Sequence, residues 1–179
     1  MLIGARDKDA FTPVQRRTYD LIASGPRRDV PYPFLAMLDA PGLADAIQAV
    51  GAAIRFDGAL DAPAREVAIM AAAGAFGSGY EWDYHAAIAR DLGMSEAVIA
   101  ATLSGAVETI PEDRAACLVI TLCRAAVREH RVPPDTLAEL AALLGRTAAS
   151  EVVAISGYYP LLALFLSAGG LDHPPPEMK

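Results

Sequence analysis

The sequence contains little of what thiol-redox chemistry requires. Only two of its 179 residues are cysteines, Cys117 and Cys123. Residues six apart on a helix lie about 120° from each other around its axis. The two thiols therefore cannot form a Cys-x-x-Cys pair, and they do not have the spacing of metal ligands. We interpret both as small buried apolar groups, and nothing in the sequence demands an oxidising compartment.

Basic residues are also scarce. The 15 Lys and Arg are outnumbered by 22 Asp and Glu, which gives a formal net charge of -7. The closest approach to a basic run is the pair Arg27-Arg28. Because phosphate contacts need clustered positive charge, we expect no nucleic-acid partner. The first residues, MLIGARDKDAF, lack the apolar segment of a signal peptide, so we expect a cytoplasmic protein.

One segment is long and uncharged. Residues 152–171, VVAISGYYPLLALFLSAGGL, are 20 residues without a charge, which is enough to span a bilayer. The segment also contains Pro160 and the pair Tyr158-Tyr159, and neither flank carries the Lys/Arg cluster that borders many membrane helices. We interpret it as a buried helix and expect no membrane partner.

Helix start and stop signals recur along the chain, and no segment alternates cleanly between apolar and polar residues. We predict an all-α fold of about eight or nine helices, forming a single domain over residues 1–179. The Pro-rich tail, residues 172–179, is expected to be loosely held. The predicted helices begin at a cap or a proline near Pro13, Pro41, Asp61, Ser78, Ser95, Pro111, Asp135 and Ala148.

Three polar residues, Ser78, Glu81 and His85, lead into the stripe of the predicted helix that later carries Ile88 and Leu92. Ser78-x-x-Glu81 is the pattern of a capping box, which would account for the first two. It does not account for His85. An isolated histidine on an apolar stripe is usually a core residue satisfied by one neighbour, and Glu81 at i−4 is such a neighbour.

Glu66 is a second polar residue in an apolar stripe. Its predicted helix is apolar on every side and should be buried, and a buried glutamate needs a partner. A tight turn at residues 77–79 should make the two helices antiparallel. At 1.5 Å per residue, Glu66 then lies about 15 Å and His85 about 10 Å from the turn, an offset that a Glu side chain roughly closes.

Two carboxylates would thus converge on one imidazole. The hypothesis is an acid–base set in which His85 moves a proton and a glutamate fixes its tautomer. A metal ion held by Glu66, Glu81 and His85 is the weaker interpretation, because no second histidine is near.

At these residues the sequence resembles the carboxymuconolactone decarboxylase family, within the alkylhydroperoxidase D-like superfamily. The resemblance covers roughly residues 34–171 and implies that superfamily's helical fold, with about residues 1–50 as an N-terminal helical extension. It also implies a homo-oligomer, commonly a trimer or hexamer. The similar segments are Arg65-Glu66, Tyr80-Glu81-Trp82 with His85, Gly93-Met94-Ser95 and GYYPLLALFLSAGG.

The redox members of that superfamily carry Glu, then Cys-x-x-Cys, then His four residues after the second cysteine. Ser78 and Glu81 occupy the two cysteine positions here. A disulfide-exchanging peroxidase needs both thiols, so an antioxidant oxidoreductase is the disfavoured alternative. The decarboxylase members are similar in lacking the pair and keeping the histidine. Their reaction, loss of CO2 from a carboxylated muconolactone in aromatic catabolism, needs no organic cofactor.

We therefore expect a cofactor-free lyase acting on a small carboxylated lactone or organic acid. His85 is the expected proton-transfer residue, with Glu66 and Glu81 as its partners and Ser78 as a substrate hydrogen-bonder or cap. The candidate pocket walls are Tyr80, Trp82 and Tyr84, and of these Trp82 is nearest the polar stripe, with plain packing as its favoured role. A non-catalytic helical oligomer that kept the fold and lost the chemistry is the third hypothesis.

Overall fold

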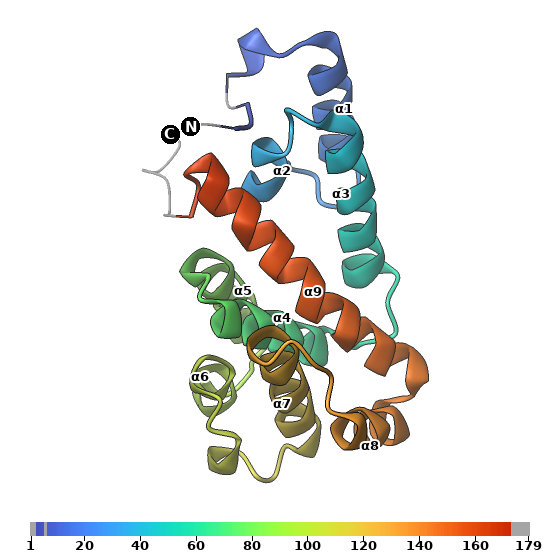
Figure 1. Ribbon diagram of the computed structural model, residues 1–179, viewed down its shortest axis with the longest axis vertical. Coiled ribbons are helices and arrows are strands. Elements are labelled where there is room, and N and C mark those ends of the chain that lie inside the picture. Colours follow the sequence, from blue (N-terminus) through green and yellow to red (C-terminus); the bar gives the residue numbers. More distant parts are fainter. Residues whose placement is uncertain (1–2, 6, 173–179) are drawn as a thin grey trace. The chain divides into compact units, whose positions relative to one another are not determined.

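The computed structural model describes residues 3–5 and 7–172, and these residues are helical along most of their length (Figure 1). They form nine α-helices, α1 to α9, and two short 3-10 helices, η1 and η2, and no strand is assigned among them. The predicted all-α fold of about eight or nine helices is confirmed. The tail predicted at residues 172–179 lies outside the described residues, except for Asp172.

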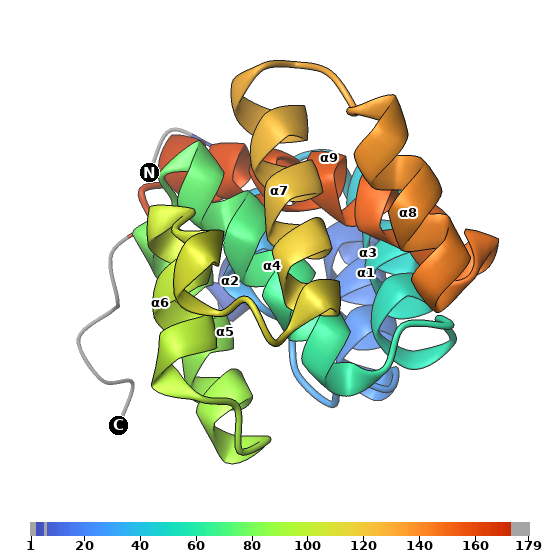
Figure 2. The same ribbon diagram turned by 90° about the horizontal axis from the view of Figure 1, so that it is seen from below.

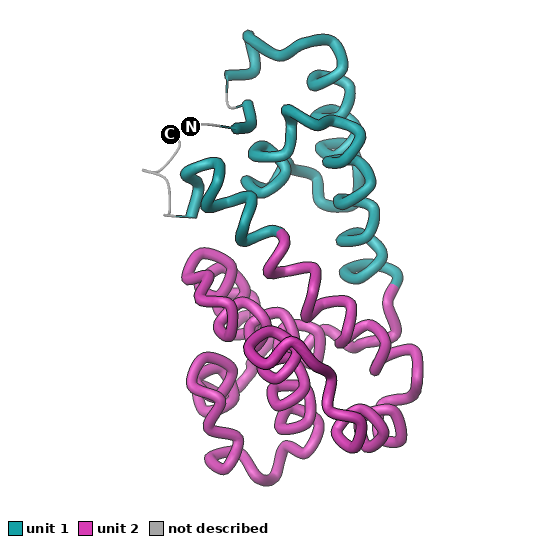
Figure 3. Tube along the Cα trace, in the orientation of Figure 1, with its two compact units in different colours: residues 1–57, 162–179 teal, residues 58–161 magenta. Residues whose placement is uncertain are grey.

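The chain divides into two compact units (Figure 3). Unit 1 comprises Met1–Asp57 and Leu162–Lys179, and unit 2 comprises Gly58–Leu161. The boundary between the units falls within the last helix, α9 (Arg146–Gly169). The single domain over residues 1–179 and the extension at about residues 1–50 stay predictions.

Unit 1 is built from η1 (Lys8–Ala10), α1 (Pro13–Ser24), α2 (Tyr32–Ala36), α3 (Pro41–Phe56) and the end of α9. Helix α1 packs against α3. Thr12 caps the start of α1 just before Pro13, and together with Gln15 it forms a capping box. A Cβ atom on Gly169 would lie 2.9 Å from the Cβ of Ala36, so only glycine fits where α9 passes α2.

Unit 2 holds all the predicted site residues. Its central element is α4 (Ala62–Phe76), which packs against α5 (Gly79–Asp91), α6 (Glu96–Ser104) and α7 (Arg114–Arg128) (Figure 2). Every residue of α4 from Glu66 to Gly74 is buried, as expected for a helix that is apolar on every side. The unit is completed by η2 (Val107–Thr109), α8 (Pro134–Leu144) and the first part of α9.

Local capping sets most helix starts in unit 2. Asp61, Ser78 and Ser95 each accept a hydrogen bond from the backbone amide three residues ahead, at the starts of α4, α5 and α6. The predicted start at Pro111 is wrong, because α7 begins at Arg114. The Asp113 carboxylate caps it by accepting from the Ala116 amide, which satisfies a backbone donor that would otherwise be unpaired.

Helix α9 is long and apolar enough to cross a membrane by length and composition, with a mean hydropathy of 1.6 over an 18-residue window. Half of that window, 50%, is buried inside the protein. In unit 2 its buried residues include Val152, Ile155 and Tyr159. The core helix of a soluble protein has the same properties, so α9 by itself is weak evidence for a membrane span.

Candidate active site

A tight turn joins α4 to α5 and sets the register between them. Gly77 ends α4 with a left-handed φ of 90°, a conformation that favours glycine. The backbone amides of Gly77 and Ser78 both donate to the carbonyl of Ala73. The Oγ of Ser78 then accepts from the amide of Glu81 at 3.4 Å and begins α5. Helices α4 and α5 therefore pack antiparallel, as the tight turn at residues 77–79 predicts.

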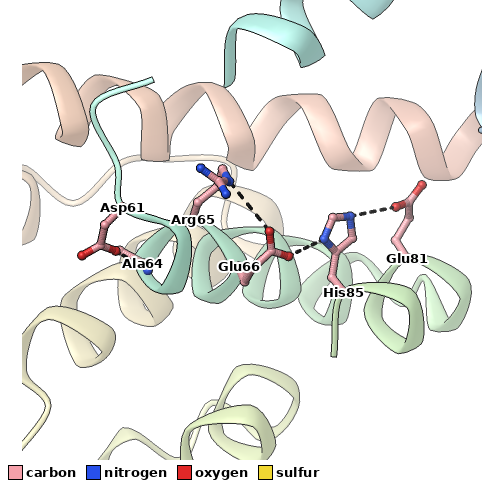
Figure 4. A network of polar contacts seen from close by, with 6 residues as sticks. All are labelled: Asp61, Ala64, Arg65, Glu66, Glu81 and His85. Carbon is pink, nitrogen blue, oxygen red and sulfur yellow. Dashed lines mark hydrogen bonds and ion pairs between the residues drawn. The ribbon is translucent and has the colours of Figure 1, made fainter. Parts of the chain in front are cut away.

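His85 of α5 lies between two carboxylates (Figure 4). Its Nδ1 is 2.5 Å from Oε2 of Glu66 on α4, and its Nε2 is 3.7 Å from Oε2 of Glu81. The exposed fractions of the three residues are 1% for Glu66, 4% for Glu81 and 2% for His85. The predicted convergence of two carboxylates on one imidazole is thus present in the structure.

The short contact between Nδ1 of His85 and Oε2 of Glu66 determines where one proton lies. Two acceptors cannot approach to 2.5 Å without a proton between them. Either the imidazole N–H donates to Glu66, or a protonated Glu66 donates to the ring nitrogen. In both cases one proton is held between Nδ1 and Oε2, and Nε2 is the ring nitrogen with the longer carboxylate contact.

Two tyrosine rings fix the plane of the imidazole. Tyr84 and Tyr159 each place a ring centroid 5.2 Å from that of His85, at interplanar angles of 75° and 87°. Tyr159 comes from α9 and was not among the predicted site residues. The segment GYYPLLALFLSAGG, which contributed to the resemblance, was the available signal, but no local pattern says that α9 contacts α5.

Arg65 extends the network on the other side of Glu66. Its Nε lies 3.7 Å from Oε1 of Glu66, the carboxylate oxygen that does not face His85. Figure 4 shows the resulting row of ionisable side chains, in the order Arg65, Glu66, His85 and Glu81. Arg65 was part of the resembling Arg65-Glu66 pair but was not predicted as a site residue.

Only half of the predicted capping box is formed. Ser78 accepts from the Glu81 amide, but the Ser78 amide that a capping-box glutamate would accept from donates to Ala73. The Glu81 carboxylate faces His85 instead. A reciprocal capping box is therefore the wrong description of Glu81, whose side chain belongs to the buried network.

The three aromatic residues predicted as pocket walls lie in different surroundings. Trp82 donates from Nε1 to Oγ1 of Thr102 on α6 at 2.9 Å, and it packs against a buried cluster that includes Met70 and Ile99. Tyr84 is 52% exposed beside the His85 ring, and Tyr80 is partly buried. These contacts place Trp82 in the packing between α5 and α6. The substrate-binding assignment of all three stays a prediction.

The two thiols lie on α7 and are held as protonated groups. Burial raises the pKa of Cys123 from 9.0 to about 12, and burial also raises the pKa of Cys117. The Cys117 thiol is directed at the carbonyls of Val107 and Ile110. Because the thiolate is the reactive form, neither cysteine has the properties of a redox-active residue.

The arrangement does not bring Glu66, Glu81 and His85, the ligands of the weaker metal interpretation, to one point. Glu66 and Glu81 face opposite nitrogens of a single imidazole, so they cannot share an ion bound at either nitrogen. Among residues 3–5 and 7–172, no group of three or more His, Cys, Asp or Glu side chains is arranged to hold a metal ion.

A separate cleft of about 410 Å³ lies beside η2, α7 and α8. Its lining includes the ion-paired Arg114 and Glu139, together with Cys117 and Thr121. None of the residues of the His85 network lines it, so the cleft is distinct from the candidate active site.

Comparison with known proteins gives one family match. The model of the carboxymuconolactone decarboxylase family matches residues 41–121, a range that contains Glu66, Ser78, Glu81 and His85. No curated protein matches the chain. Over residues 41–121, this chain is therefore similar to the carboxymuconolactone decarboxylase family.

Proposed function

We propose that the protein is a decarboxylase-like carbon–carbon lyase that acts on a small carboxylated lactone or organic acid. The observation that carries the proposal is the buried His85, with a carboxylate at each ring nitrogen. Such an imidazole is suited to proton transfer. Glu66 can hold the proton at Nδ1 in place while Nε2 gives up and regains its proton.

The proposed step begins when the bond from carbon to the carboxylate breaks. CO2 leaves, and the electron pair stays on carbon, delocalised into the neighbouring carbonyl as an enolate. A proton from Nε2 of His85 then forms the new C–H bond. The imidazolium becomes neutral, and Glu81, 3.7 Å from Nε2, is placed to pass on a proton taken up from water, which restores the imidazolium. Glu66 keeps the proton at Nδ1 and the orientation of the ring. The chemistry as written needs no organic cofactor.

The peroxidase-like alternative within the superfamily requires a thiolate and a resolving thiol. Ser78 and Glu81 supply neither, and burial keeps Cys123 protonated. A non-catalytic helical oligomer is the other alternative. It predicts that the buried network serves stability alone, and the test below separates the two.

We also propose a cytoplasmic homo-oligomer, a trimer or hexamer, with a small-molecule substrate and with no nucleic-acid or membrane partner. The exposed apolar residues of unit 1 support an assembly. Val14 and Leu21 on α1, and Leu43 and Val50 on α3, are each about half exposed. Residues seven apart share one helix face, so each helix presents an apolar stripe that a second copy could cover.

The test is CO2 release from a panel of carboxylated γ-lactones and keto acids, measured for the wild type and for His85→Gln. Glutamine preserves the volume and one hydrogen bond but cannot move a proton, so turnover should fall by about 10²–10⁴-fold. Circular dichroism and the melting temperature should show that the variant keeps its fold. Near wild-type turnover in His85→Gln would show that the assigned role is wrong.

A further inference from the structure

The reactive atoms of the candidate active site are closed to solvent. The exposed fractions of Glu66, Glu81 and His85 are 1%, 4% and 2%, and each ring nitrogen of His85 faces a carboxylate. A group that takes the proton of Nε2 must come within hydrogen-bond reach of that nitrogen. Some neighbouring side chain therefore has to move before a molecule as large as a lactone reaches the ring.

Tyr84 is the neighbour of His85 that is best placed to move. Its ring lies 5.2 Å from that of His85, and the residue is 52% exposed. Tyr159, on the other hand, is 3% exposed, and its ring packs in turn against that of Tyr158. Of these two rings against the imidazole, one is thus fixed inside the protein and the other borders the solvent.

The hydroxyl of Tyr84 has no hydrogen-bond partner within the described part of the chain. Trp82, two residues earlier on α5, is by contrast tied to Thr102 of α6 by a hydrogen bond. An aromatic side chain on a helix has two staggered χ1 positions available, and exposed side chains exchange between such positions rapidly. The ring of Tyr84 can therefore swing away without moving the backbone of α5, while Glu66 and Tyr159 still hold the imidazole.

We propose that Tyr84 is the gate of the His85 site, so that its ring covers the imidazole until the side chain rotates, and its size limits which molecules enter. The inference deepens the proposed function and rests on it for the identity of the molecule admitted. The gate itself concerns access to a ring nitrogen, so a reagent that is not a substrate can measure it.

The probe is diethyl pyrocarbonate, which acylates an unprotonated imidazole nitrogen. Peptide mass spectrometry should give the rate at His85 relative to that at His130, which is exposed just after α7 and serves as the reference within each sample. The variants are Tyr84→Ala, Tyr84→Phe and Tyr84→Trp. Leu92→Ala is the matched control, because Leu92 ends the same helix and is 45% exposed.

We expect His85 to react more slowly than His130 in the wild type. Tyr84→Ala should raise the His85 rate by about 2- to 10-fold, the factor by which the loss of one aromatic contact shifts an opening equilibrium. Tyr84→Phe and Leu92→Ala should match the wild type, and the bulkier ring of Tyr84→Trp should slow the reaction. Rate profiles against pH separate a change in access, which alters the limiting rate, from a change in the pKa of the ring, which alters the midpoint.

Equal limiting rates at His85 in the wild type and in Tyr84→Ala would overturn the inference, as would an equal rise in Leu92→Ala. Substitutions that merely loosened α5 would speed the reaction in Tyr84→Ala and Tyr84→Trp alike, and that outcome would also overturn it. A lower rate in Tyr84→Trp beside a higher rate in Tyr84→Ala is the result that only a gate produces.

The two proposals can fail separately. If the His85 rate follows the size of the side chain at position 84 while no carboxylated lactone is turned over, the lyase proposal fails and the gate stands. If turnover depends on His85 but the reaction with diethyl pyrocarbonate does not depend on Tyr84, the gate fails and the lyase proposal stands. Once a substrate is found, Tyr84→Ala should raise kcat/KM for bulkier analogues relative to that substrate.

Discussion

Oε2 of Glu66 lies 2.5 Å from Nδ1 of His85, and the two side chains are 1% and 2% exposed. This contact joins α4 to α5 across the interior of unit 2. It is therefore both a structural link and the central geometric feature of the proposed chemistry, and substitutions at either residue should separate these two roles.

Glu66→Ala and Glu66→Gln should differ in stability. Alanine leaves the His85 ring without its buried partner, so the free energy of unfolding should fall by about 3–5 kcal/mol. Glutamine keeps the volume and one hydrogen bond and should cost less. Both variants should lose most turnover, because neither holds the Nδ1 proton as a carboxylate does. Urea denaturation with CO2-release assays on the same samples measures both effects, and full activity in Glu66→Gln would contradict the assigned role.

Ser78 and Ser95 form a matched pair of helix caps. Ser78 Oγ accepts from the Glu81 amide at 3.4 Å, and Ser95 Oγ accepts from the Val98 amide at 3.3 Å. Ser78→Ala and Ser95→Ala should each cost about 0.5–2 kcal/mol of stability and leave turnover within a few-fold of the wild type. A loss of turnover confined to Ser78→Ala would show that this hydroxyl contacts the substrate.

Trp82→Phe should behave as a packing variant. It removes the hydrogen bond to Thr102 while keeping an aromatic ring against the buried cluster, so the free energy of unfolding should fall by about 0.5–1.5 kcal/mol. Substrate affinity should not change. Chemical denaturation followed by circular dichroism measures the stability, and titration with substrate measures the binding. A large loss of affinity would establish Trp82 as a pocket wall.

The cysteines should be unreactive in the folded protein at neutral pH. Burial raises the pKa of Cys123 to about 12, so iodoacetamide should modify it only after denaturation. Hydroperoxide consumption with a dithiol reductant should be the same in wild type and in the Cys117/Cys123 double serine variant. Cysteine-dependent turnover would contradict the proposed chemistry.

The same raised pKa predicts a pH dependence of stability. As pH rises above about 9, the Cys123 thiol ionises in the unfolded chain and remains protonated in the folded protein up to about pH 12. The unfolded state then binds fewer protons, so stability falls with a slope of up to about 1.4 kcal/mol per pH unit. Cys123→Ala should remove this contribution. Urea denaturation between pH 8 and about 11 compares the two slopes, and identical slopes would contradict the prediction.

The sequence by itself determined the helices and one pair of site residues. Asp61, Ser78 and Ser95 begin their helices through hydrogen bonds that span only three residues, so their positions could be predicted locally. The meeting of Glu66 with His85 could also be predicted, because two consecutive helices joined by a short turn have a register set by the helix rise. The start of α7 was placed wrongly, since Pro111 and Asp113 offer competing signals two residues apart and the Asp113 cap is the one formed.

Only the tertiary structure decided the rest of the network. Tyr159 meets His85 through the packing of α9, a long-range contact that no local pattern contains. Glu81 had two partners within reach, the Ser78 amide and the His85 ring, and the buried ring is the one it faces. Arg65 and Glu66 are adjacent, and so point about 100° apart around the helix axis. Their side chains nevertheless return to within 3.7 Å of each other, because long side chains take the rotamers that the surrounding helices leave open.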